Sequence, residues 1–477
     1  MSSHGLPGGS AGPPAGEAIV WLHLTDLHCG QPGERTRWPT ARGPFLDDLR
    51  AQAAQGGLGP PQMICISGDL AYSGKAREYD KVQQTLADIR AAVGGNPVVV
   101  AVPGNHDLTR PSPADATALG LARYHDDGAL RRELLSRRSS THAFVRRRFD
   151  GYQKFFRDVI EADWKARGLR YRLGALPGDF ILHVPFAATA GPGGSLAIVG
   201  LNSAFLQLLG GDYERRLAVE PEQLPGDLPR ELETADAALL LLHHPPDWLH
   251  RRCREAFERD IHPPGRFVAC LFGHMHAHRA LSETGAAGLP RRYLQGSSLF
   301  GLEQWGETET RETGYAWYRL TRSDAAAGVL QRFPRKALFR DDGSLSVVPD
   351  LSAGPSPQSY RVMLCVRFTS SASFVDPPRP PVLDASAPGV VNPFLHTGRV
   401  TDPAQFVGRR ALLHQILGEL DGGSNRALIG PAQIGKSSIL SMVCALGPSR
   451  LRLPPSSFVY LNLQLFSDAG DFWGALC

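Results

Sequence analysis

The chain has 477 residues, a formal net charge of +4, 42% hydrophobic residues and 21% charged residues. This composition excludes a wholly disordered chain, and the length predicts two or three domains at about 100–200 residues each. The seven cysteines form no CxxC pair, and no apolar run approaches about 18 residues. We therefore expect a cytoplasmic protein without a disulfide framework and without a membrane span.

Arginine greatly outnumbers lysine among the 51 basic residues. The lysines are Lys75, Lys81, Lys154, Lys165, Lys336 and Lys436. This bias has two interpretations, a coding preference or a surface that binds nucleic acid. A net charge of +4 spread over the whole chain does not by itself favour a polyanionic partner.

In chain order, residues 1–16 are rich in Gly, Pro and Ser and predict a flexible tail. Short apolar runs follow, each with the length of a buried strand and each ending at polar residues. They cover residues 18–24, 61–67, 97–102, 196–200, 238–242 and 267–272. Between the second and third runs, residues 75–93 have the apolar periodicity of a helix. Strands that alternate with helices predict an α/β fold with layered sheets.

Residues 108–180 interrupt this alternation and are predicted to form a helical insertion. Apolar side chains between Thr141 and Trp164 have helical spacing, with many arginines opposite them. Two interpretations stay open: the insertion packs on the core, or it caps a site where an arginine binds a phosphate. The candidates for that contact are Arg146, Arg147, Arg148 and Arg157.

Two further β-leaning runs, residues 315–320 and 360–368, precede a Pro-rich stretch at 376–389. Proline-rich sequence of this kind is typical of a semi-rigid linker. We therefore predict one domain over residues 17–350, a linker over 351–400 and a second domain over 401–477.

The predicted strands end in residues that commonly bind metal ions. They are Asp26, His28, Asp69, Asn105, His106, Asp107, His243, His244, His274 and His276. Asp26 with His28, and His274 with His276, are i,i+2 pairs, whose side chains point the same way in an extended segment. A carboxylate between two such pairs, as Asp69 would be, can bridge two ions. Mixed nitrogen and oxygen ligands suit two divalent ions drawn from Mn, Fe, Zn, Co or Ni.

Five blocks of the sequence resemble those of the calcineurin-like metallophosphoesterase superfamily, in its phosphodiesterase-like branch. They are DLH (26–28), GDLAYSG (68–74), GNHD (104–107), HHPP (243–246) and GHMH (273–276). All five occur in the order typical of the family, within residues 18–300. The resemblance implies a four-layer α/β/β/α sandwich with a dinuclear metal site, and hydrolysis of a phosphoester by a metal-activated hydroxide.

The resemblance also implies the ligands of each ion. Asp26, His28, Asp69 and His276 would hold the first ion, and Asp69, Asn105, His243 and His274 would hold the second, with Asp69 bridging. The family pattern favours His243 over His244 as the ligand and leaves His244 a structural role.

The same resemblance implies two catalytic residues in the GNHD block. His106 would contact the phosphate or protonate the leaving oxygen, and Asp107 would orient His106. The glycines of the blocks, Gly68, Gly104 and Gly273, would permit sharp turns and close backbone approach.

A second motif lies near residue 430. GPAQIGKS (430–437) fits GxxxxGK[ST] between a short strand signal at 425–429 and a helical run at 437–446. In such a loop Gly430 and Gly435 shape the backbone around phosphates, Lys436 contacts the β- and γ-phosphates, and Ser437 binds Mg²⁺. With FVGR at 406–409, the segment resembles the start of a STAND/AAA-like P-loop NTPase domain. The resemblance implies a partial P-loop α/β domain that binds ATP with Mg²⁺, in a truncated protein or a fragment.

We therefore expect a metal-dependent phosphodiesterase fused to a P-loop regulatory module, with a small phosphodiester or nucleotide as substrate. Two alternatives stay open. One is a metal-dependent nuclease that acts on DNA or RNA, and the other is a non-catalytic nucleotide-sensing protein with a vestigial metal site. The complete ligand set favours an enzyme, since a vestigial site would have lost ligands.

Overall fold

The structure is a computed structural model of the chain. It describes residues 18–31, 34–54, 57–186, 194–275, 278–284, 289–299, 313–323, 327–339, 345–353, 356–364, 410–421, 436–451, 453–454 and 457–458. The chain divides into two units, the first formed by Met1–Thr284 and Leu289–Ser370 and the second by Gly285–Gly288 and Ser371–Cys477. The predicted tail over 1–16 lies outside the described residues.

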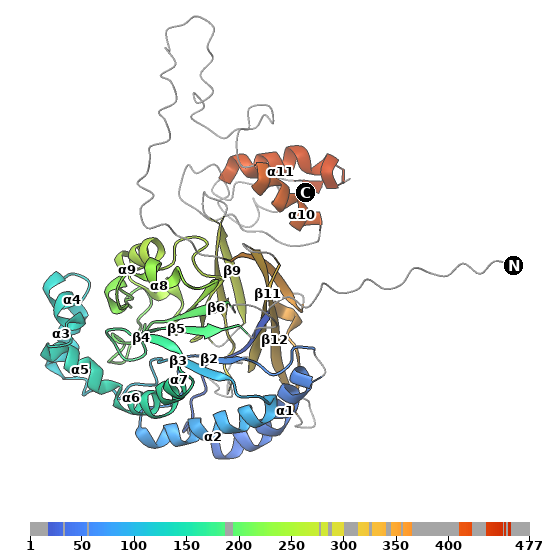
Figure 1. Cartoon of the computed structure of the whole chain (residues 1–477). Coiled ribbons are helices and arrows are strands. Elements are labelled where there is room, and N and C mark those ends of the chain that lie inside the picture. The colour runs from blue at the N-terminus through green and yellow to red at the C-terminus, as the bar shows by residue number, and fades with distance from the viewer. Residues whose placement is uncertain are drawn as a thin grey trace, which may run out of the picture. The chain divides into compact units, whose positions relative to one another are not determined.

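The first unit contains two seven-stranded sheets (Figure 1). The first sheet has the order β13-β12-β11-β1-β2-β3, with β14 also paired to β12. Its strands are β1 (Ala18–Leu24), β2 (Met63–Ser67), β3 (Val98–Val102), β11 (Gly314–Arg322), β12 (Ala327–Phe339), β13 (Leu345–Pro349) and β14 (Gln358–Met363). β1, β2 and β3 run parallel, whereas β11 pairs antiparallel with β1. The parallel strands are the predicted apolar runs, and they are buried because both faces of such a sheet are covered.

The second sheet has the order β4-β5-β6-β7-β8-β10-β9. Its strands are β4 (Arg170–Leu173), β5 (Phe180–Pro185), β6 (Ser195–Gly200), β7 (Ala237–Leu241), β8 (Ala269–Phe272), β9 (Arg279–Thr284) and β10 (Pro290–Gln295). β6, β7, β8 and β10 run parallel, and β5 and β9 pair antiparallel to their neighbours. Three of the parallel strands, β6, β7 and β8, match predicted runs to within two residues at each end.

One hydrophobic core joins the two sheets, with Ile64 and Val100 from the first and Ile198 and Leu240 from the second. The helices outside the sheets are α1 (Glu34–Ala54), α2 (Ala76–Val93), α8 (Leu228–Leu232) and α9 (Arg251–Ala256). Short helical turns are η1 (Leu121–Arg123), η3 (Pro221–Gln223), η4 (Pro246–Trp248), η5 (Phe257–Ile261) and η6 (Leu351–Ala353). In Figure 1, α1 and α2 lie beside β2 and β3, while α8 and α9 lie at another side of the unit. The unit is thus a mixed α/β fold with two sheets.

The predicted insertion is helical, as expected, but it ends earlier. Its helices are α3 (Ala116–Gly120), α4 (Gly128–Leu135), α5 (Ser140–Arg148), α6 (Asp150–Phe155), η2 (Phe156–Glu161) and α7 (Ala162–Ala166). Figure 1 shows α3, α4 and α5 grouped at one side of the unit. β4 falls within the predicted range and pairs with β5 instead. It is an edge strand with exposed arginines, so its sequence lacks the apolar signal of a strand.

The predicted domain end at residue 350 is too early. β14 pairs with β12 in the first sheet, so the sheet extends to Met363, and the linker predicted over 351–400 must begin after it. Most of the predicted linker lies outside the described residues.

The second unit is described as two helices. α10 (Arg410–Asp421) and α11 (Lys436–Leu451) share a small apolar cluster that includes Leu413, Ile416 and Met442. Gly430, Gly435 and the FVGR segment lie outside the described residues, so the structure does not test the predicted phosphate loop. Across both units, none of the described helices combines the length and the apolar character that crossing a membrane requires.

Candidate metal centre

Loops that follow five strands bring the predicted ligands together. Asp26, Asp69 and Asn105 follow β1, β2 and β3, whose carboxyl ends meet because the strands are parallel. His243 and His274 follow β7 and β8, which are also parallel. The backbone amide of His274 donates a hydrogen bond to Asp26 Oδ2 at 3.1 Å and so joins the loops of the two sheets. In α/β proteins, binding sites form at the carboxyl ends of the strands, where these ligand groups lie.

Asp69 lies at the centre of these side chains and is buried. Its Oδ2 lies 3.9 Å from Nε2 of His28 and 3.3 Å from Nε2 of His243. Its Oδ1 accepts a hydrogen bond from the backbone amide of His106 at 2.7 Å. Two groups of donor atoms include Asp69, one with His28 and His106 and the other with Asp26 and His243, each within 4.8 Å. A carboxylate shared by two such groups has the position of a bridging ligand.

The second sheet contributes the imidazoles on the other side of Asp69. Nε2 of His243 lies 3.1 Å from Oδ1 of Asn105 and 3.3 Å from Nδ1 of His274. Nδ1 of His243 donates to the carbonyl oxygen of Ser67 at 2.9 Å, which leaves Nε2 to face the carboxylate of Asp69. Histidines that bind metals are commonly fixed in this way by a hydrogen bond from the other ring nitrogen.

Four of the predicted ligands have a left-handed backbone. Their φ angles are 52° for Asp26, 45° for His28, 53° for Asp69 and 68° for His274. Among the non-glycine residues in the described part of the chain, Arg215 is the one other case. Such a conformation costs about 1–3 kcal/mol per residue and clusters at functional sites. The fold therefore holds these side chains in place against a local penalty, which indicates a functional constraint.

Two glycines let the loops approach the ligands closely. A Cβ atom on Gly68 would lie 2.3 Å from Nδ1 of His243, and the φ of Gly68 is 101°. A Cβ atom on Gly104 would lie 2.2 Å from Oδ1 of Asp69 and 2.6 Å from its backbone nitrogen. Both glycines are therefore required by the space around the ligands.

His106 reaches the centre, but Asp107 does not orient it as predicted. Nδ1 of His106 donates to the carbonyl oxygen of Tyr72 at 2.8 Å, and its ring lies 4.7 Å from that of His28. The carboxylate of Asp107 instead accepts hydrogen bonds from the amides of residues 70, 71 and 104, at 2.9–3.0 Å, and from the hydroxyl of Tyr79. Because it binds backbone, Asp107 fixes the two loops that carry Asp69 and His106.

His244 is buried beside the centre, with its ring 4.7 Å from that of His243 and 4.5 Å from that of His274. Its Nδ1 lies 2.9 Å from the Ser203 hydroxyl and its Nε2 lies 2.7 Å from Oε1 of Gln207. Burial and the neighbouring imidazoles of His274 and His243 lower the pKa of His244 well below its usual value. A neutral ring with both nitrogens hydrogen-bonded fits the structural role predicted for His244. The assignment of His243 as the ligand of the pair stays a prediction.

The charges of the centre fit divalent cations. Burial raises the pKa of Asp26. Burial also disfavours ionised Asp69, but the imidazoles of His243, His106 and His28 hold its pKa well below the usual range. Burial opposes a charge on His243, yet Asp69 and Asp26 raise the pKa of His243 to about 9. Buried carboxylates thus draw positive charge into the centre, and a mixed set of imidazole, carboxylate and amide donors suits divalent transition metals.

Some predicted residues are not placed at the centre. His276 lies outside the described residues, so its role stays a prediction. Arg146 and Arg157 line a cavity of about 250 Å³ in the insertion, together with residues 173–179 and none of the predicted ligands. The guanidinium of Arg148 packs over the ring of Phe144 in the same insertion. The described contacts therefore favour packing of the insertion on the core over a phosphate contact by these arginines.

Three further residues shape the site without having been predicted. The hydroxyl of Thr25 donates to Oδ2 of Asp26 at 2.7 Å. The carbonyl oxygen of Tyr72 fixes His106, and the ring of Trp248 lies 4.4 Å from that of His274. Thr25 and Tyr72 lie beside or within the sequence blocks, so their positions could have indicated that they are near the site. A hydrogen bond to a backbone carbonyl and the packing of two rings cannot be predicted from residue types.

Comparison with family models matches residues 20–278 to the calcineurin-like phosphoesterase family. None of the curated proteins compared matches the chain. Solved structures similar to this chain include a dimetal phosphatase from Danio rerio, at 12% identity and a TM-score of 0.33, covering 69% of this chain and 98% of that one. A purple acid phosphatase from yellow lupin has 11% identity and a TM-score of 0.35, covering 74% and 55%. Vps29 of Chaetomium thermophilum has 11% identity and a TM-score of 0.27, covering 73% and 98%.

Proposed function

The chain belongs to the calcineurin-like phosphoesterase family and is a phosphoester hydrolase, and from this premise we propose that it cleaves phosphodiesters at a centre of two divalent metal ions. One observation carries the proposal. The buried Asp69 carboxylate is shared by two groups of donor atoms, with Oδ2 within 3.9 Å of His28 Nε2 and 3.3 Å of His243 Nε2. Two ions bound there would supply a water of lowered pKa and would withdraw charge from the phosphoryl oxygens.

The residues that would hold the ions lie around Asp69. Oδ1 of Asp26 lies 3.8 Å from Nε2 of His28, and Asp26 also shares a group of donor atoms with Asp69 and His243. Asn105 Oδ1 and His274 Nδ1 are 3.1 Å and 3.3 Å from Nε2 of His243. The resemblance adds His276 to the ligands of the first ion.

His106 is placed to act on the leaving group. Its amide donates to Asp69 and its Nδ1 donates to Tyr72, so the ring is held with Nε2 as its remaining polar atom. From that position the imidazolium can donate a hydrogen bond to a phosphoryl oxygen or a proton to the departing alkoxide. Asp107, which binds the backbone of both loops, keeps His106 and Asp69 at this spacing.

A comparison of leaving groups tests the role of His106. A nitrophenolate departs readily without a proton, whereas an alkoxide needs one. His106→Asn should therefore slow hydrolysis of an alkyl phosphodiester by about 10²–10⁴-fold and of a bis-nitrophenyl phosphate by much less. An equal loss for both substrates would show that His106 does not deliver the proton.

The substrate class is tested by a panel with Mn²⁺ on the chelated and reloaded full chain. Bis-nitrophenyl phosphate, cyclic nucleotides, a phosphomonoester, single-stranded DNA and RNA would each be supplied at the same phosphate concentration. A small-phosphodiester enzyme turns over the first two classes faster than the others. Absence of hydrolysis for every ester, with metal bound, would refute the proposal.

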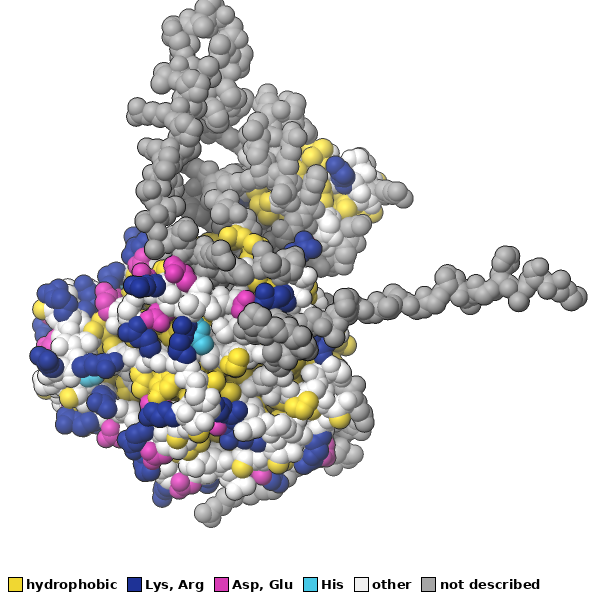
Figure 2. All heavy atoms as spheres, viewed as in Figure 1, with side chains coloured by type: hydrophobic (Ala, Val, Ile, Leu, Met, Phe, Trp, Pro, Cys, Tyr) yellow, Lys and Arg dark blue, Asp and Glu magenta, His cyan; other side chains and the backbone are white. Residues whose placement is uncertain are grey.

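A nuclease is the second candidate, and the charge of the insertion favours it. Arginines of α3–α5 and the turns between them are exposed, among them Arg123, Arg132, Arg138 and Arg147. Figure 2 shows Lys and Arg side chains gathered on the side of the unit where α3, α4 and α5 lie. A nucleic acid bound there would lose affinity steeply as salt rises, because phosphate contacts release counterions. Cleavage of DNA or RNA that is faster than that of small diesters and is abolished by salt would establish this candidate.

We also propose that residues 430–437 bind a nucleotide. The support is that α11 begins at Lys436, with Ser437 next, as the P-loop motif requires of the helix that follows it. Lys436→Ala should abolish binding of a fluorescent ATP analogue by the full chain while leaving the phosphodiesterase rate unchanged. Equal binding by both proteins would contradict the assignment.

A further inference from the structure

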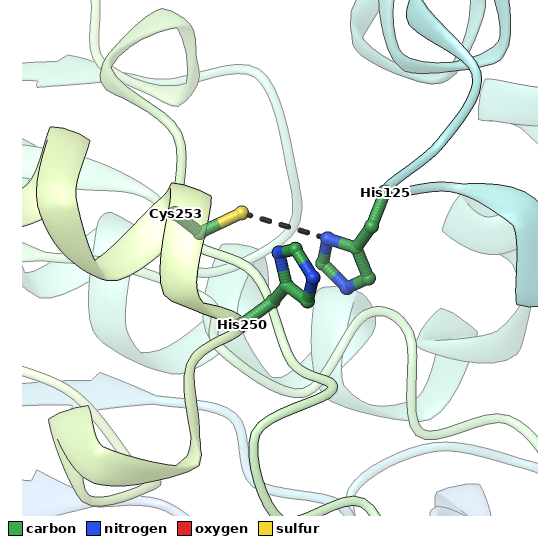
Figure 3. Close-up of side chains that lie close together, drawn as sticks. All are labelled: His125, His250 and Cys253. Atoms are coloured by element: carbon green, nitrogen blue, oxygen red, sulfur yellow. Dashed lines mark hydrogen bonds between the residues drawn. The ribbon is translucent and has the colours of Figure 1, made fainter.

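A second group of metal-type side chains lies in the first unit, and its three side chains include none of the ligands predicted for the dinuclear centre. It consists of His125, His250 and Cys253, whose candidate donor atoms all lie within 4.8 Å of one another. His125 comes from the turn between η1 and α4 of the insertion, His250 directly precedes α9, and Cys253 lies in the first turn of α9. Figure 3 shows the Sγ of Cys253 directed at the His125 ring, with the His250 ring beside it.

We propose that His125, His250 and Cys253 form a binding site for a Zn²⁺-type divalent cation that ties the helical insertion to α9. Thiolate and imidazole donors together are the set that Zn²⁺ prefers in structural sites. Because Zn–N distances are about 2.0–2.1 Å and the Zn–S distance is about 2.3 Å, a tetrahedral ion separates its sulfur and nitrogen ligands by about 3.6 Å. Sγ of Cys253 lies 3.7 Å from Nδ1 of His125.

The hydrogen bonds of His125 leave the correct nitrogen for an ion. Its Nε2 donates to the carbonyl oxygen of Arg216 at 2.7 Å, so Nδ1, the atom that faces Cys253, carries the lone pair. Burial lowers the pKa of His125, which favours the neutral ring that a metal requires. A hydrogen bond from the far ring nitrogen to a backbone carbonyl is the usual support of a ligating histidine.

His250 supplies a buried nitrogen that has no other use. Nδ1 of His250 has no hydrogen-bond partner, although it is shielded from solvent. The ring stacks on that of His125, with centroids 4.0 Å apart and planes inclined by 17°. Buried polar atoms without a partner are rare, and an ion is one of their standard explanations. A rotation of the His250 ring would carry this nitrogen from the stack onto the ion.

The backbone around the site is fixed independently of the ligands. Leu217 and Leu249 form a parallel bridge, and the amide of His250 donates to the carbonyl oxygen of Leu217 at 2.8 Å. The same loop supplies the Arg216 carbonyl that holds His125. A surface hollow of about 510 Å³, lined by His250 and Arg215 among others, lies next to the site.

Glu220 provides a nearby negative charge and an oxygen that could be a fourth ligand. Its Oε1 lies 3.5 Å from Sγ of Cys253, and its side chain also pairs with Arg252. Burial and this carboxylate raise the pKa of Cys253 to about 12, so the thiol is protonated until an ion displaces the proton. Bound zinc deprotonates a coordinating thiol outright. Glu220 or a water would complete a tetrahedral site.

A metal ion bound at this site would connect the insertion to a segment that lies near the dinuclear centre. Trp248, whose ring lies 4.4 Å from that of His274, is two residues before His250. An ion at His250 and Cys253 would therefore fix both ends of α9's first turn to the insertion and restrain the segment that packs on a predicted ligand.

Cobalt substitution tests the proposal without reference to hydrolysis. The full chain would be stripped with a chelator and titrated with Co²⁺, which gives an intense thiolate-to-cobalt absorption in the near-ultraviolet. The dinuclear centre contributes no such band, since its donors are nitrogen and oxygen. Wild type should show the band, and Cys253→Ser should lack it. The matched control is Cys444→Ser, at a half-buried cysteine of the second unit, which should retain it.

His125→Gln guards against loss of fold, because His125 is only half-buried and the variant keeps the thiol. It should need about 100-fold more Co²⁺ for the same absorption. The proposal is overturned if wild type gives no thiolate band, if Cys253→Ser gives the wild-type band, or if His125→Gln titrates as wild type does. None of these results depends on whether the chain cleaves phosphodiesters.

Discussion

Replacing Gly104 with alanine should displace the bridging carboxylate while leaving the fold intact. The added Cβ would lie 2.2 Å from Oδ1 of Asp69 and 2.6 Å from its backbone nitrogen, where real Cβ atoms do not come closer than 3.0 Å. The neighbouring loop must therefore move by about 0.8 Å. Gly104 does not have a left-handed φ, so alanine is compatible with its backbone, and the strain falls on Asp69.

The expected loss follows from that displacement. A misplacement of about 1 Å in a catalytic group costs about 10²-fold in rate. We therefore expect kcat/KM of Gly104→Ala for bis-nitrophenyl phosphate to fall about 100-fold, which corresponds to about 2.7 kcal/mol of transition-state stabilisation. The free energy of unfolding should fall by about 1–3 kcal/mol, the usual range for an overpacked buried position.

Steady-state kinetics with Mn²⁺, metal analysis and urea unfolding would measure these effects side by side. Gly120→Ala is the matched control, because a Cβ atom there meets nothing within 4 Å and the residue has helical backbone angles. If Gly104→Ala were as active as Gly120→Ala and bound as much metal, the inferred contact with Asp69 would be wrong.

Two further predictions concern buried histidines. His244→Ala should lower the unfolding free energy by about 2–4 kcal/mol but keep the metal content, whereas His243→Ala should lose metal; equal metal loss in both would contradict the assignment. Burial and Arg291 lower the pKa of His262 to about 3, so between pH 6.5 and 3 the unfolded chain binds the proton first and stability falls as pH falls. In the His262→Phe variant, the free energy of unfolding should fall by about 1.4 kcal/mol less per pH unit, as measured by urea unfolding in the presence of chelator. If the dependence of this free energy on pH were the same as in wild type, the prediction would be refuted.

The sequence was most informative where a strand is buried on both faces. β1, β2 and β3 are short apolar runs, and the end of each strand could be predicted because polar residues of the ligand type follow it directly. α1 was missed because Pro39 and Pro44 interrupt its pattern, although Phe45, Leu46 and Leu49 anchor it in the core. β12 was missed for a similar reason, since it contains Pro334 and charged residues.

The ligand types could be predicted, whereas their geometry could not. Spacing and resemblance predicted Asp69 as a shared ligand, and in the structure its Oδ2 lies within 3.9 Å of His28 Nε2 and 3.3 Å of His243 Nε2. Asp107 does not orient His106 directly as predicted, because its carboxylate binds three backbone amides and the Tyr79 hydroxyl. Contacts with backbone amides cannot be read from residue types. The group of His125, His250 and Cys253 could not be predicted from the sequence either. His125 is 125 positions before His250, and the three side chains meet only because the insertion packs on α9.

The central claim is that Asp69 bridges two metal ions that the hydrolysis requires. Asp69→Asn keeps the size of the side chain and its contact with the His106 amide but removes the shared negative charge. Metal content and Mn²⁺-dependent hydrolysis of bis-nitrophenyl phosphate, measured on the same preparations, test the claim most directly. The account predicts loss of metal from the centre and a rate lower by about 10³-fold or more in the variant. A variant that retained the wild-type metal content and rate would contradict it.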